Sequence, residues 1–387
     1  MEKKSRWTTT PKAERLKEAR LSRGLTMTEL AQKLNISRQA ISKYEKNVMS
    51  PSHEIIRNMS DILEFPESFF FKDFDNDNIR FSPTYYRSLK TTENAYKKMF
   101  YMRLEWARRL IGILEDFLNL PTLNIPEALD SSCEIADEKT EEMASSLRKF
   151  WGLGLNPISD LTRLVEANGI FVSRINYGAT RIDACSKISD SRAYIMLSED
   201  KASAVRSRFD LAHELGHFLL HRDWTDDEYE EHFNLVEKQA HQFAGALLMP
   251  RETFTQEIYS TSLEHLIELK RRWKVSLAAI IYRCSTLELF SEGQVQRLRI
   301  ELGRRKWKRV EPLDDVIPAE SPVLIRKALE LLFTQQVISP TEIMNVMGIS
   351  EYDFSALCNI DLSYFKSQDE NKKITFRLIG SSNGIKK

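Results

Sequence analysis

Five of the seven histidines in this 387-residue chain lie within 29 residues, from His213 to His241. The segment RFDLAHELGHFLLH (208–221) predicts a helix on which His213 and His217 are four residues apart. This spacing places both imidazoles on one face, where they can bind one tetrahedral Zn²⁺ at about 2.0–2.1 Å. Glu214 is turned by about 100° from His213, so it can act as a general base toward an attacking water. The alternative is a pair of hydrogen-bonded core histidines, because the other faces of this helix are apolar.

A catalytic zinc site needs a third protein ligand. The longer HExxHxxGxxH pattern is absent, since Leu220 replaces its glycine, and His221 is about 12 Å along the axis from His213. Glu237 on the next predicted helix is the better candidate, and it completes a His₂Glu, gluzincin-like set. That helix has a small, apolar packing face, formed by Ala240, Phe243, Ala244 and Leu247. His241, one turn after Glu237, is a polar neighbour of the ligands, an electrophile for the scissile oxyanion, or an ordinary helix-face histidine.

The N-terminal seventy residues predict a set of short helices. Apolar periodicity indicates helices near 11–24, 29–34, 38–44 and 52–63, with Thr26 or Thr28 capping the second and Ser37 the third. The second and third form a helix-turn-helix shape. The third presents side chains that reach base edges and phosphates in the major groove, namely Arg38, Gln39, Ser42 and Lys43. The alternative is a small helical bundle that contacts protein.

Charge is distributed unevenly along the chain, although the 56 basic and 56 acidic residues give a net charge of zero. Residues 1–50 hold twelve Lys or Arg against five Asp or Glu, a local balance of +7. Residues 223–237 hold seven acids and no Lys or Arg. The overall neutrality therefore does not exclude a nucleic-acid partner for the N-terminal part.

The sequence RLKEAR-x2-RGLTMTELAQKLNISRQAISKYEKN (15–47) resembles the phage-repressor (Xre/Cro) class of helix-turn-helix domains. The resemblance covers about residues 12–71 and implies five helices and binding to double-stranded operator DNA. One position departs from the class. Met27 stands where many such repressors carry a DNA-contacting Gln, which puts a contact from that position in doubt.

Residues 151–250 resemble the ImmA/IrrE family of zinc metallopeptidases. The resemblance rests on WGLG-x2-PI, the strand-like GIFVS (169–173), the segment AYIML (193–197) as an edge strand, RFDLAHELGHFLLH and ExxAHxFAxxLLMP. It implies that His213, His217 and Glu237 hold zinc and that Glu214 is the catalytic base. The strands imply a small sheet, beside which a substrate strand can lie.

Four domains follow from these patterns: a helix-turn-helix domain (1–71), a helical connector or dimerisation element (72–140), an HExxH peptidase domain (141–310) and a C-terminal helical region of unreadable role (311–387). The predicted fold is mainly α with a small β-sheet. The four cysteines are widely spaced without a CxxC pair, which favours free thiols. No apolar run approaches the ~20 residues of a membrane helix, and no signal peptide is visible, so we expect a cytoplasmic location and no membrane partner.

Together the patterns predict a DNA-binding regulator fused to a Zn²⁺-dependent endopeptidase. Its expected partners are operator DNA and a protein substrate, in the first instance a repressor, and homodimerisation is left open. The alternative is a non-catalytic helix-turn-helix regulator or antitoxin that uses the peptidase fold as a sensor or scaffold. Another alternative is a peptidase whose helix-turn-helix binds protein.

Overall fold

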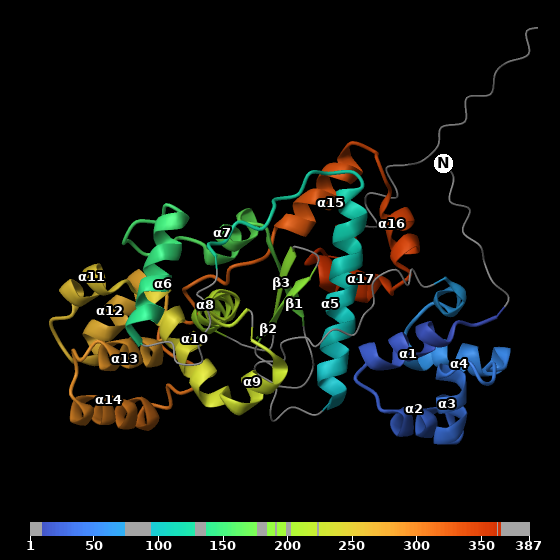
Figure 1. Cartoon of the computed structure of the whole chain (residues 1–387), viewed down its shortest axis with the longest axis horizontal. Helices are drawn as coiled ribbons and strands as arrows, with labels where there is room; N and C mark the ends of the chain where they lie inside the picture. Colours follow the sequence, from blue (N-terminus) through green and yellow to red (C-terminus); the bar gives the residue numbers. More distant parts are fainter. Residues whose placement is uncertain are drawn as a thin grey trace, which may run out of the picture.

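The computed structural model describes residues 10–73, 94–127, 137–175, 184–189, 192–198, 203–222, 224–361 and 363–364. This part of the chain is mainly helical with one small β-sheet, which confirms the predicted fold class (Figure 1). Residues 1–9 and 365–387, which belong to the predicted first and last domains, lie outside the described residues. No helix in the described ranges is long and apolar enough to cross a membrane.

The N-terminal module consists of α1 (Ala13–Ser22), α2 (Met27–Leu34), α3 (Arg38–Glu45), α4 (His53–Leu63) and η1 (Glu67–Phe71). Of the two candidate caps of α2, Thr26 makes a capping box with Glu29. The Ser37 hydroxyl accepts a hydrogen bond from the backbone N–H of Ala40 at the start of α3. The fifth element is a 3-10 helix, and Phe69 and Phe70 on it are fully buried.

In the described part of the predicted connector, residues 94–115 form a long helix, α5 (Asn94–Glu115). Its apolar residues pack inside the same chain, against the N-terminal module, the sheet and the C-terminal helices. The next helix, α6 (Asp137–Phe150), begins inside the polar stretch that precedes the predicted peptidase domain. Because the apolar residues of α5 are buried by contacts within the chain, α5 serves as an internal scaffold that joins the N-terminal module to the sheet and the C-terminal helices.

The sheet has three strands, β1 (Ile170–Ile175), β2 (Ala184–Ser189) and β3 (Arg192–Ser198), in the order β1-β3-β2. β3 pairs in parallel with β1 and antiparallel with β2. The prediction that residues 193–197 form an edge strand is therefore wrong: this strand is central. The physical reason is its unbroken apolar run, which is buried on both faces. No pattern in the sequence predicted β2, which forms an edge of the sheet.

Alternate residues of the strands belong to two different hydrophobic cores. One face packs on α8 (Ala204–Leu220) through Ile170, Val172, Ala184, Ala193, Ile195 and Leu197. The opposite face joins a core that contains the N-terminal module, α5 and the C-terminal helices, through Phe171, Cys185, Tyr194 and Met196. Because successive side chains of a strand point to opposite faces, the sheet lies between the two cores and contributes side chains to both.

The first core is completed by helices on either side of α8. They are α6, α7 (Leu161–Ala167), α10 (Phe233–Leu248), α11 (Arg251–Phe254), α12 (Leu263–Trp273), α13 (Leu277–Thr286) and α14 (Glu292–Arg304). Helix α9 (Asp226–Glu231) packs in a smaller cluster with Trp224 and Val236, and the short η2 (Thr255–Glu257) has no buried residue. The chain ends its described part with α15 (Leu324–Thr334), α16 (Pro340–Met347) and α17 (Glu351–Cys358).

Candidate metal centre

The candidate site is built on two helices that pack closely, α8 and α10. Gly216 of α8 permits this approach, since a Cβ placed there would lie 3.0 Å from the Phe243 ring of α10. Phe243 and the small residues beside it on α10 are fully buried against α8. The short distance between the helices brings Glu237, in the second turn of α10, to the face of α8 that carries the two histidines.

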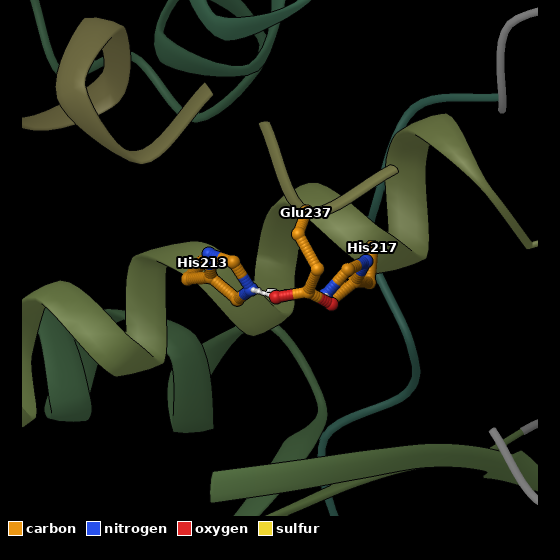
Figure 2. A group of neighbouring side chains, drawn as sticks. All are labelled: His213, His217 and Glu237. Carbon is orange, nitrogen blue, oxygen red and sulfur yellow. Dashed lines mark hydrogen bonds and ion pairs between the residues drawn. The ribbon is translucent and has the colours of Figure 1, made fainter. Parts of the chain in front are cut away.

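His213, His217 and Glu237 converge on one point (Figure 2). Their ligand atoms all lie within 4.8 Å of one another. The Nε2 atoms of the two histidines are 3.0 Å apart. Glu237 places one carboxylate oxygen 3.2 Å from His213 Nε2 and the other 3.5 Å from His217 Nε2. Figure 2 shows the Glu237 side chain reaching from α10 to a position between the two rings.

The electrostatics of this trio favour a charged carboxylate. Burial by itself raises the pKa of Glu237, but hydrogen bonds and charges from His213 and His217 outweigh it and hold that pKa far below its usual value. Burial likewise tends to lower the pKa of His213, yet the hydrogen bond and charge of Glu237 raise it overall. The site therefore holds an acidic group that stays negative at neutral pH beside two imidazoles.

This donor set fits zinc. Imidazole nitrogen and carboxylate oxygen are zinc ligands, and three protein ligands with a remaining open position are typical of catalytic zinc sites. The two imidazoles come from one helix turn and the carboxylate from a second helix, so the three ligands approach from different directions. The trio is mostly buried, with His217 at 0% and His213 at 8% exposure, and Glu237 is its most exposed member.

Glu214 lies on the sheet side of α8 and is almost fully buried. Its carboxylate accepts a hydrogen bond from the hydroxyl of Ser186 on β2. Ser186 points to this side because it alternates with Cys185, which faces the other core. The edge strand thus fixes the side chain predicted to act as the base, a link that sequence reasoning missed because it did not detect β2.

His241 lies beside the trio and is exposed. Its ring centroid is 4.8 Å from that of His213, 5.4 Å from Phe209 and 6.3 Å from Tyr282. The structure therefore places His241 at the open side of the site, next to a candidate ligand.

Two further residues, Tyr229 and His221, contact the trio, and Gln239 contacts His221; none of the three was assigned a role from the sequence. The Tyr229 hydroxyl donates a hydrogen bond of 2.6 Å to Glu237. His221 Nδ1 lies 3.1 Å from His217 Nδ1, and His221 Nε2 lies 2.9 Å from Gln239 Oε1. Tyr229 lies in α9, within the acidic stretch that the sequence analysis interpreted only as charge. The contact of His221 with His217 could have been predicted from the sequence, because residues four apart on a helix lie on the same face.

The predicted DNA-contacting residues form a separate surface on α3. Arg38, Gln39 and Lys43 are exposed and Ser42 is partly exposed, while Ile41 and Tyr44 face the core. Helices α2 and α3 lie at the lower edge of the view in Figure 1. The outward face of α3 is therefore open to solvent.

Comparisons with known proteins match both parts of the chain. Residues 16–70 match the helix-turn-helix family model, and residues 165–285 match the model of a peptidase family described as the IrrE N-terminal-like domain. A putative HTH-type transcriptional regulatory protein of Aeropyrum pernix is 44% identical over 57 residues, which is 15% of this chain and 17% of that protein. The chain thus combines a helix-turn-helix module with an IrrE N-terminal-like module.

Proposed function

We propose that this chain, with a helix-turn-helix module and an IrrE N-terminal-like module, is a transcriptional regulator that also acts as a zinc-dependent endopeptidase. Its substrate is a repressor or another regulatory partner protein. The observation that carries the proposal is the convergence of His213, His217 and Glu237 within 4.8 Å, with both histidines on the same helix as the buried Glu214.

In this proposal, residues of α8 and α10 bind the metal, accept a proton and bind the oxyanion. His213, His217 and Glu237 hold the zinc ion, which supplies Lewis acidity and a nucleophilic water at neutral pH. Glu214 accepts the proton of the attacking water, and the Ser186 hydroxyl keeps its carboxylate oriented. His241, at the open side of the site, donates to the oxyanion that develops on the scissile carbonyl.

The substrate is proposed to bind as an extended strand beside β2, which lies at an edge of the sheet among the described strands. Because Ser186 of this strand contacts Glu214, a peptide along that edge would pass close to the proposed base. An extended segment of a partner protein is therefore the substrate class that this arrangement supports.

The helix-turn-helix module is proposed to bind double-stranded operator DNA through α3. Arg38 and Lys43 contact phosphates, and Gln39 and Ser42 face base edges. The basic balance of residues 1–50 supports this role. We expect Arg38→Ala combined with Lys43→Ala to weaken duplex binding by the full chain and to reduce its dependence on salt, measured by titration at several salt concentrations. Unchanged affinity and salt slope would instead favour a protein partner for this module.

Catalysis is tested by comparing wild type with Glu214→Gln, which keeps the three metal ligands. Zinc content is measured after purification without added metal, and cleavage of candidate repressors is followed by mass spectrometry. We expect both proteins to bind zinc and only wild type to cleave. If zinc-loaded wild type cleaves no candidate and Glu214→Gln regulates genes as wild type does, the peptidase fold is a scaffold and the enzymatic part of the proposal is wrong.

A further inference from the structure

A buried chain of three side chains runs from the metal centre to the interior between α8 and α10. Its members are His217, His221 and Gln239, each with 0% exposure. His217 Nδ1 lies 3.1 Å from His221 Nδ1, and His221 Nε2 lies 2.9 Å from the side-chain oxygen of Gln239. The second nitrogen of His217, Nε2, faces His213 and Glu237.

The chemistry of these atoms sets the positions of the protons. The Gln239 oxygen can only accept a hydrogen bond, so His221 must carry its proton on Nε2. A neutral His221 then has a lone pair on Nδ1, which accepts from His217. His217 therefore carries a proton on Nδ1, and in the neutral form that binds a metal its lone pair is on Nε2, the atom that faces the other two candidate ligands.

We infer that His221 and Gln239 are positioning residues that hold His217 in the tautomer and orientation required to bind the metal. The inference rests on the proposed zinc site and deepens it. His217 cannot be held by solvent, because it is fully buried, so its ring needs a protein partner on Nδ1. The position of His221 makes this possible, since it follows His217 by one helical turn at the end of α8.

The test measures zinc affinity by competition with a chromophoric chelator, using the full chain. We expect His221→Leu and Gln239→Met to bind zinc about 10- to 100-fold more weakly than wild type. His221→Asn, whose side-chain oxygen can accept from His217 Nδ1, and Gln239→Glu, which keeps an acceptor, should stay closer to wild type. His265→Leu, which removes a buried histidine of α12, is the matched control and should leave the affinity unchanged.

A spectroscopic readout separates positioning from a general loss of packing. In the zinc-loaded wild type, the Nδ1 proton of His217 should give a slowly exchanging ring N–H signal in NMR spectra of histidine-labelled protein. This signal should disappear in His221→Leu and return in His221→Asn. If wild type binds zinc tightly and His221→Leu matches it in affinity and signal, the inference is wrong and the proposed zinc site stands. If wild type itself binds no zinc, the proposed function fails, and the inference fails with it.

Discussion

Individual side chains in this protein depend on partners from distant parts of the sequence. Glu166 at the end of α7 is an example. Its carboxylate accepts hydrogen bonds from the backbone N–H groups of Val323 and Leu324, at the start of α15. One carboxylate thus caps a helix that lies more than 150 residues later in the chain.

Glu166 predicts a pH dependence of stability. Burial raises its pKa from the usual 4.5 to about 7, even though the two backbone N–H groups act in the opposite direction. Between these values the folded protein holds a proton that the unfolded chain releases, so the free energy of unfolding falls as pH rises through this window. We expect a loss of about 1–3 kcal/mol between pH 5 and pH 8.

Urea unfolding of wild type and Glu166→Gln at both pH values measures this effect. The neutral amide removes the titration, so the stability of the variant relative to wild type should increase with pH. Glu330→Gln, on a partly exposed position of α15, is the control and should keep the wild-type trend. The same trend in Glu166→Gln and wild type would show that another group is responsible.

At the scale of elements, the site depends on how closely α8 and α10 approach. The helix that carries HELGH has a glycine where it meets Phe243, and a Cβ at Gly216 would lie 3.0–3.2 Å from that side chain. This contact is tighter than ordinary packing, so Phe243 must give way to an added methyl group by a few tenths of an ångström. We expect α10 to shift with Phe243 and to carry Glu237 away from the histidines.

We expect Gly216→Ala to weaken zinc binding, measured by chelator competition, with a net change in stability of about 0–2 kcal/mol. Overpacking costs about 1–3 kcal/mol, and the better helix propensity of Ala offsets about 1 kcal/mol of it. Gly112→Ala on α5 is the matched control, because nothing lies within 4 Å of a Cβ there. The control should be neutral or slightly stabilising, and equal zinc affinity in Gly216→Ala and wild type would contradict the packing argument.

The sequence predicted the elements with strong local signals. The helices of the N-terminal module carry capping residues and apolar periodicity, and they lie within about two residues of their predicted bounds. It did not predict β2, because Ala184–Ser189 has few apolar residues and gains its burial from tertiary packing. Nor did it pair Gln239 with His221, since that contact depends on how α8 and α10 pack.

At the scale of the whole molecule, α17 contacts both modules. Asp353 on α17 forms two 2.8 Å hydrogen bonds with Arg23 of the helix-turn-helix module. The backbone carbonyl of Leu357, one turn later, accepts a hydrogen bond from Ser173 on β1. The C-terminal helices therefore join the DNA-binding module to the sheet that carries Ser186.

We expect Asp353→Asn to loosen this junction. Asp353 is almost fully buried, so the change leaves Arg23 beside a neutral partner and costs about 1–3 kcal/mol. Thermal unfolding of the full chain should then show an earlier transition for the helix-turn-helix module. Glu351→Gln on the exposed side of the same helix is the control. Identical unfolding of the two variants would show that the ion pair does not hold the modules together.

The core that joins the N-terminal module, α5 and the C-terminal helices contains residues from Leu16 to Ile360. This continuity limits how the gene can be rearranged. A recombination event that moves the helix-turn-helix coding region into another gene leaves behind the apolar faces of α5 and the C-terminal helices. The recipient gains a module whose own packing partners are missing. Exchange of the DNA-reading specificity is therefore expected to proceed through substitutions on the outward face of α3, while the buried residues behind it change together with α5 and α17.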